Sequence, residues 1–169
     1  IDNLSSIADS FSSFAQLPAP HNEVFNFSKL LRETLSIYSS DEFQIHLEIV
    51  EEVMIYADVD LMRQILNNLI INAIQSYIES PYYLEVGLQI KDDKFLLAIK
   101  DRGQGISDLD VSNIFKPYFT TKKNGMGIGL AFAKKGIEQG GGNIWFETEK
   151  EVGTSFFIKM PLASLKKFF

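Results

Sequence analysis

Apolar residues recur three or four positions apart in four stretches of the chain, which predicts four helices. These stretches are residues 1–17, 30–38, 59–79 and 126–138. Alternating or β-rich runs elsewhere in the chain predict strands. The predicted strands are 24–25, 44–50, 53–57, 83–90, 95–100, 143–148 and 154–160. Asn26 or Ser28 is expected to cap the second helix, and Asp58 the third.

The first predicted helix has apolar residues along one side and Ser, Asp and Asn between them. The apolar positions are Ile1, Leu4, Ile7, Phe11 and Phe14. A helix this short is marginal in water by itself, so we interpret it as the end of a helical hairpin or bundle that can dimerise. The alternative is an amphipathic helix packed on its own domain. Pro18 and Pro20 stop the helix, which predicts a domain boundary there.

The predicted helix at 59–79 carries a polar face beside its apolar one. Asn68, Asn72, Gln75 and Ser76 fall within about 100° of one another at helical spacing. Asparagine is a mediocre helix former, so two of them one turn apart among apolar residues need an explanation. One explanation is a polar stripe that faces water. The functional one is that the Asn72 oxygen coordinates Mg²⁺, which prefers oxygen ligands, while Asn68 binds phosphate or a bound water.

Two glycine clusters flank a polar and aromatic loop that leaves the strand at 95–100. They are Gly103 and Gly105 within residues 101–106, and Gly125, Gly127 and Gly129 within residues 125–130. Glycine lets backbone N–H groups approach a ligand closely, and a helix start adds unpaired N–H groups, an arrangement that suits phosphate. The alternative is a set of flexible turn glycines in a surface loop. Neither cluster matches the Walker or dinucleotide-binding patterns.

Composition and charge exclude several classes of function. With 169 residues, of which 46% are hydrophobic, the chain can bury a sizeable core. Its net charge of -6 argues against a nucleic-acid or anionic-membrane surface. Cysteine is absent, so disulfides and thiol chemistry are excluded, and no apolar run approaches a membrane span. The chain opens on Ile1 rather than Met, and we expect it to be a fragment of a longer protein.

Five short motifs, in this order, resemble the ATP-binding domain of sensor histidine kinases in the GHKL superfamily. They are Asn68-Leu69-Ile70-Ile71-Asn72-Ala73, Asp101 to Gly105, Ile114 to Lys122, Gly125 to Leu130, and Gly153-Thr154-Ser155-Phe156. The resemblance covers residues 24–162. Phe11 to Ala15, with Pro18-Ala19-Pro20, is similar to the end of the dimerisation hairpin in kinases of the NtrY and NtrB type.

The resemblance implies an α/β fold, a two-layer sandwich known as the Bergerat ATP-binding fold. In it, a mixed sheet of about five strands carries about three helices on one face, and a short helix precedes it here. Residues 1–20 would then be the end of a dimerisation and phosphotransfer helix with its linker, and residues 21–169 the ATP-binding domain.

The resemblance also assigns roles to residues. Asp101 is expected to accept a hydrogen bond from the adenine amine, with Thr154 supporting it through water, while Ile106 lines the adenine slot. Lys122 or Lys123 would neutralise γ-phosphate charge. The implied cofactor-binding residues are Asn68, Asn72, Ser76, Asp101, Gly103, Gly105, Ile106, Lys122, Lys123, Gly125, Gly127, Ile128, Gly129, Leu130 and Thr154. Of these, Asn68 and Lys122 are expected to be catalytic and Asn72 to be the metal ligand.

The partners implied are ATP or ADP with Mg²⁺, a response-regulator receiver domain and the protein's own upstream phosphoacceptor helix. A homodimer in the intact protein is expected, with no nucleic acid. No His-Glu motif is present, because His21 follows the proline stop and His46 lies in a predicted strand. The acceptor histidine is therefore expected upstream of Ile1. The domain is expected to be cytoplasmic, in a full-length protein that upstream segments can anchor in a membrane.

Two other functions remain open from the sequence. One is an ATP-gated clamp of the same superfamily, such as gyrase B or MutL. The other is a nucleotide-binding module that grips another protein. Two features favour the kinase. The helix predicted at 1–17, with its apolar side, is followed by Pro-Ala-Pro as in a kinase hairpin, and the chain is too short to hold a clamp's transducer domain.

Overall fold

The computed structural model describes residues 19–164 except 41, 51, 80, 123 and 124. The helix predicted at 1–17, Pro18 and Lys123 therefore lie outside the described residues.

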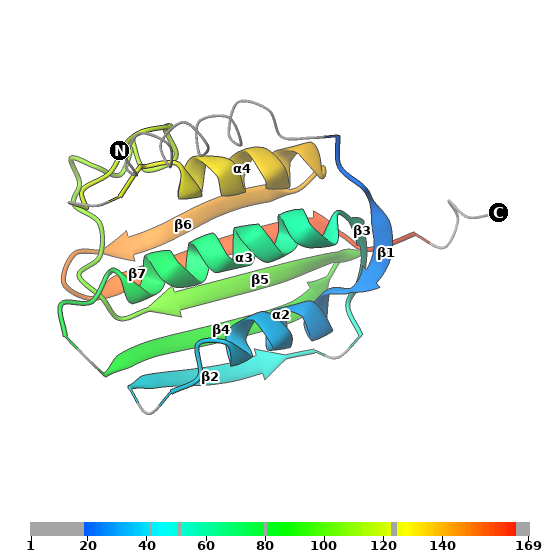
Figure 1. The fold of residues 1–169 in the computed structure, drawn as a ribbon, viewed down its shortest axis with the longest axis horizontal. Helices are drawn as coiled ribbons and strands as arrows, with labels where there is room; N and C mark the ends of the chain where they lie inside the picture. The colour runs from blue at the N-terminus through cyan, green and yellow to red at the C-terminus, as the bar shows by residue number, and fades with distance from the viewer. Residues whose placement is uncertain (1–18, 41, 51, 80, 123–124, 165–169) are drawn as a thin grey trace, which may run out of the picture.

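A five-stranded mixed sheet forms one layer of the domain (Figure 1). In spatial order its strands are β2 (Phe43–Ile49), β4 (Tyr82–Lys91), β5 (Lys94–Asp101), β7 (Gly153–Pro161) and β6 (Asn143–Glu149). β2 runs parallel to β4, and the other neighbours are antiparallel. β1 (Glu23–Asn26) and β3 (Met54–Ala57) pair in a separate two-stranded sheet. Asp101 is thus the last residue of the central strand of the larger sheet.

Three helices cover one face of this sheet and form the second layer (Figure 1). They are α2 (Phe27–Ser36), α3 (Val59–Ile74) and α4 (Gly129–Gln139). Asn26 caps α2, since its side chain accepts from Lys29 N at 3.0 Å, and Asp58 caps α3 by accepting from Leu61 N at 2.9 Å. The predicted two-layer α/β sandwich is confirmed. None of the helices among the described residues is long and apolar enough to cross a lipid bilayer.

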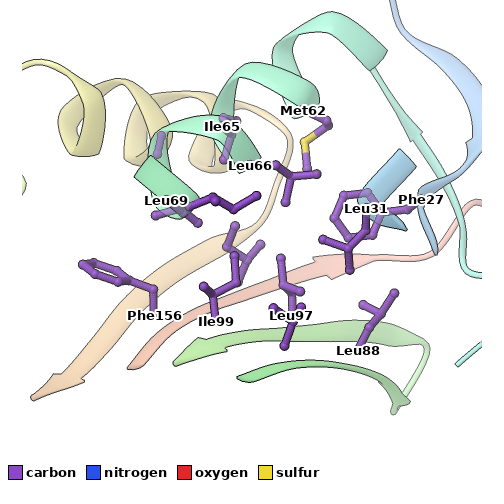
Figure 2. Packing of buried hydrophobic residues seen from close by; sticks show 14 of the residues in the cluster. Phe27, Leu31, Met62, Ile65, Leu66, Leu69, Leu88, Leu97, Ile99 and Phe156 are labelled. Atoms are coloured by element: carbon purple, nitrogen blue, oxygen red, sulfur yellow. The ribbon is translucent and has the colours of Figure 1, made fainter. Parts of the chain in front are cut away.

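The core lies between the helices and the sheet (Figure 2). Leu66 and Leu69 of α3 point at the inner face of the sheet, where Leu97 and Ile99 of β5 meet them. Phe27 at the start of α2 stacks on Phe95, with ring centroids 4.7 Å apart. Because close-packed interiors resist deformation, this layer fixes α3 relative to the end of β5.

The helix predicted at 59–79 ends earlier, at Ile74. Beyond it the Tyr77 hydroxyl takes up contacts outside the helix: it accepts from Arg102 N at 2.7 Å and donates to Tyr83 O at 2.6 Å. These contacts pull the chain away from the helix axis. The predicted extension to residue 79 was therefore wrong.

The helix predicted at 126–138 begins later, at Gly129. Gly127 has a φ of +66°, a left-handed conformation that a right-handed helix does not contain. Most strand boundaries differ from the predicted ones by only one or two residues, which is the usual fraying of element ends.

Candidate functional site

A cavity of about 690 Å³ lies between α3, the start of α4 and the loop that joins β5 to α4. The last residue of β5, Asp101, and the second residue of β7, Thr154, contribute to its wall. Segments far apart in the sequence therefore meet around one space. The polar face of α3, which the sequence left open to water or to a ligand, lines this cavity.

Asp101 is the most buried charged group of the cavity wall, at 2% exposure. Its Oδ1 accepts from Gly103 N at 2.8 Å and Thr154 N at 3.2 Å, and also from Ser76 Oγ at 3.1 Å, whose single hydrogen it shares with Ala73 O at 2.6 Å. No described residue donates to Oδ2. Since no buried side-chain oxygen among the described residues lacks a partner, Oδ2 keeps access to the cavity. Burial raises the pKa of Asp101, and its three donors oppose that shift.

A threonine pair ties the loop after β5 to the hairpin of β6 and β7. Thr148 Oγ1 accepts from Ile106 N at 3.0 Å and lies 3.0 Å from Thr154 Oγ1. These contacts hold Ile106 and Thr154 beside Asp101. Sequence reasoning missed Thr148, because only the pairing of β6 with β7 places it there.

Asn68 and Asn72 project from α3 towards the other side of the cavity. Asn68 Nδ2 donates to Gly129 O at 3.3 Å, which joins α3 to the start of α4. Asn72 Oδ1 accepts from Lys122 Nζ at 2.8 Å, and the same ammonium donates to Gln75 Oε1 at 2.9 Å. Burial lowers the pKa of Lys122, while the charge of Asp101 opposes that shift.

The donor set at Asn72 suits a hard cation. Asn72 Oδ1 already accepts from one positive charge, the Lys122 ammonium, and an amide oxygen is a ligand that Mg²⁺ accepts. No cluster of three or more His, Cys, Asp or Glu that could hold a metal occurs among the described residues. A magnesium ion here would therefore take few ligands from the protein, with phosphate oxygens and waters supplying the rest.

Several glycines around the cavity are required by contacts within the protein itself. A Cβ on Gly103 would overlap Ser76 Oγ, and one on Gly105, whose φ is +68°, would overlap Glu149 O. A Cβ on Gly127 would lie 2.5 Å from Phe119 O. Gly129 differs, because a Cβ there would meet Asn68 at an ordinary 3.5 Å. Among the described glycines that line the cavity, Gly129 alone is not required by local packing or by a left-handed backbone.

α4 begins at the cavity without a side-chain cap. No side chain of the described residues accepts from its first N–H groups, whereas α2 and α3 are both capped. The first intrahelical bond runs from Phe132 N to Ile128 O, so the earlier N–H groups have no partner within the helix. The helix therefore presents unpaired donors and a partial positive charge to the cavity.

The structure brings the predicted site residues together with two exceptions. Gly103 does not line the cavity but lies behind Asp101, and Lys123 is outside the described residues. Gln75 lines the cavity and was not predicted as a site residue, although its helical spacing from Asn72 was a signal for it. Lys150 also lines it, and no feature of the sequence pointed to that position.

Comparisons with known proteins agree with this geometry. Residues 57–164 match the family model described as histidine kinase-, DNA gyrase B-, and HSP90-like ATPase. Sporulation kinase B of Bacillus subtilis (strain 168) is 27% identical over 165 residues, which cover 95% of this chain and 39% of that protein. The chain spans less than half the length of the curated relatives it matches.

Two solved structures have the same fold. The nucleotide-free catalytic domain of the histidine kinase ThkA superposes with a TM-score of 0.75 at 28% identity, covering 83% of this chain and 95% of that one. ThkA in complex with the response regulator protein TrrA superposes with a TM-score of 0.80 at 25% identity, covering 96% of this chain and 48% of that one. The chain therefore belongs to the family of histidine kinase-, DNA gyrase B- and HSP90-like ATPases, and it is similar to sensor histidine kinases within that family.

Proposed function

We propose that this chain is the ATP-binding catalytic domain of a two-component sensor histidine kinase, which donates the γ-phosphoryl group of ATP to a histidine outside the chain. The observation that carries the proposal is the Asp101 carboxylate, whose Oδ1 is held by three donors while Oδ2 stays open to the cavity. A buried, positioned acceptor of this kind selects a ligand that brings a hydrogen-bond donor.

Adenine supplies that donor through its exocyclic amine. Ile106, Ile114 and Phe132 line the same cavity and give the ring an apolar surface. Thr154 stands beside Asp101 and supports the base through a water. Guanine would place a carbonyl oxygen against the carboxylate, which would leave two acceptors facing each other, so ATP is favoured over GTP.

The phosphates belong at the uncapped start of α4. Gly125, Gly127, Ile128, Gly129 and Leu130 line the cavity there, and the free N–H groups of the helix are donors for anionic oxygens. The small surface of Gly129 lets those oxygens come close to the backbone. Lys122, or its neighbour Lys123, then neutralises charge on the γ-phosphate during transfer.

Asn72 would hold Mg²⁺, and the ion, when bound, would neutralise charge on the phosphate oxygens. Asn68 lies one helical turn before it and keeps α4 at the correct distance through Gly129 O. Its side chain then positions a phosphate oxygen or a bound water beside the γ-phosphate. Ser76 holds Asp101 at the other end of the nucleotide.

The remaining partners follow from this assignment. The phosphoryl group would pass to a histidine on the protein's own upstream helix and then to an aspartate of a receiver domain. The solved complex of ThkA with TrrA supports the second partner, since ThkA shares this fold. We place residues 1–20 at the end of an NtrY- or NtrB-like dimerisation hairpin in a homodimeric protein. The domain would work where ATP is available, in the cytoplasm.

Transfer of label from γ-labelled ATP tests the proposal. This chain alone should bind ATP but acquire no acid-labile label, because His21 and His46 lie outside the cavity wall. Adding the upstream acceptor helix, in the same chain or as a separate one, should restore labelling, and Asp101→Asn should abolish it. Label on His21 or His46 of the isolated chain would overturn the proposal.

A further inference from the structure

Lys122 has an unusual environment for a partly buried ammonium. Its side chain donates to Asn72 Oδ1 at 2.8 Å and to Gln75 Oε1 at 2.9 Å. No carboxylate lies within ion-pair distance of it among the described residues. Two neutral amide oxygens are therefore its direct partners.

Such a cation normally pairs with a carboxylate, because taking a charge out of water is costly unless an opposite charge compensates. Amide oxygens such as these are also ligands that hard metal ions accept, so the same oxygen can serve an ammonium or a metal ion in turn. Asn72 and Gln75 lie three residues apart at the end of α3, so their side chains reach the same point. One of the two oxygens belongs to the residue to which the proposed function assigns the metal.

We propose that the Lys122 ammonium occupies the metal position at Asn72 while no nucleotide is bound, and that Gln75 is the residue that holds it there. This inference rests on the proposed function. Mg²⁺ and Lys122 then compete for Asn72 Oδ1, and the ion that arrives with the nucleotide releases the lysine. The released ammonium becomes available to the phosphates from the same loop.

The competition has a predictable size. When only a fraction of the molecules has the metal position free, the apparent affinity for Mg²⁺·ADP is the intrinsic affinity multiplied by that fraction. Removing one of the two hydrogen bonds to the ammonium should raise that fraction. Loss of one hydrogen bond of ordinary net strength should raise the affinity for Mg²⁺·ADP about two- to tenfold.

Calorimetric titration of Mg²⁺·ADP tests this directly. ADP lacks the γ-phosphate, so the measurement does not depend on a contact between Lys122 and that group. Gln75→Ala should bind Mg²⁺·ADP about two- to tenfold more tightly than the wild type. The exposed position of Gln75 means that the substitution should not disturb folding.

Gln64→Ala is the matched control, because Gln64, in α3, is likewise an exposed glutamine that lines the cavity, whereas no hydrogen bond joins its side chain to Lys122. The Gln64→Ala protein should bind Mg²⁺·ADP with the same affinity as the wild type. Equal or weaker binding by Gln75→Ala would overturn the inference and leave the proposed function standing. Failure of all three proteins to bind ADP would overturn both.

Amide hydrogen exchange in the absence of nucleotide is a second, independent test of the contact between Lys122 and Gln75. The amides of Tyr118 and Lys122 bond within the loop that the lysine fastens to α3, to Gly127 O and Thr120 Oγ1. Gln75→Ala should speed their exchange by a similar factor, and Gln64→Ala should not. Unchanged exchange in Gln75→Ala would show that the lysine does not hold the loop.

Discussion

At the scale of single residues, the two oxygens of Asp101 have different surroundings, and we assign only Oδ2 to the recognition of adenine. Oδ1 accepts from Gly103, Ser76 and Thr154 and fixes the side chain, while Oδ2 stays open to the cavity. The cost of this arrangement is a buried carboxylate, since burial raises its pKa. The recognition role that we propose for this carboxylate would therefore come at the expense of stability.

Asp101→Asn should make the fold more stable at neutral pH while weakening ATP binding. With a folded-state pKa above the ordinary value, ionised Asp101 destabilises the native state. That destabilisation is complete above the folded-state pKa and disappears as pH falls below the unfolded value of about 4. Thermal unfolding of both proteins between about pH 7 and pH 3 should show a difference that shrinks in acid.

Asp58→Asn provides a control of opposite sign. The backbone hydrogen bond from Leu61 lowers the pKa of Asp58, so its ionised form stabilises the native state. That contribution is present above the unfolded pKa and is lost as pH falls through the lower folded-state value. Asp58→Asn should therefore lower stability at neutral pH. A loss of stability at neutral pH in the Asp101→Asn protein would contradict the claim that the buried, ionised Asp101 destabilises the native state.

At the scale of elements, the helix starts differ in what they offer. Asn26 and Asp58 satisfy the first N–H groups of α2 and α3, whereas no described side chain does so for α4. A helix start without a cap loses stability that a polar side chain would have provided. The sequence places Gly129 at this point, which suits close approach by an anion better than it suits a helix.

Gly129→Ala should separate folding from binding. A Cβ has room beside Asn68, and alanine favours a helix over glycine by up to about 1 kcal/mol, so stability should stay equal or rise. Binding of ATP should weaken, because the new methyl group would stand where we propose that phosphate approaches the backbone. Gly87→Ala in β4, where no atom lies within 4 Å of the added Cβ, is the control for affinity. Unchanged ATP affinity in Gly129→Ala would place the phosphates elsewhere.

The sequence predicted most elements and the residues on which the site is built, because those signals are local. Helical spacing put Asn68 and Asn72 on one face, and alternation placed Asp101 at a strand end. The end of α3 was missed because Tyr77 contacts Arg102 and Tyr83, which lie beyond the helix. Such a contact depends on tertiary structure, which no periodicity records.

At the scale of the whole molecule, the sheet and its helices hold two walls of the cavity at a fixed separation. Leu97 at the centre of β5 is fully buried and pairs in register with Leu88 and Ile158. The contacts that close the cavity, such as Ile106 with Thr148, cross long sequence distances on this platform. They could not be predicted from the sequence, since each depends on the order of strands in the sheet.

Leu97→Ala should destabilise the whole domain by about 2–5 kcal/mol, because it leaves a cavity in a close-packed core. Urea unfolding at constant m-value would measure this change. Leu109→Ala, at a leucine that is 86% exposed, should change stability by less than about 0.5 kcal/mol. Equal effects of the two substitutions would show that the sheet centre does not carry the stability assigned to it.

The most direct test of the central claim is a calorimetric comparison of ATP and GTP, both with Mg²⁺. ATP should bind, and GTP should bind at least about a hundredfold more weakly. Asp101→Asn should lose most of the affinity for ATP. Asp93→Asn, in the turn between β4 and β5, should bind ATP like the wild type. Equal affinity for ATP and GTP, or full ATP affinity in Asp101→Asn, would contradict the account.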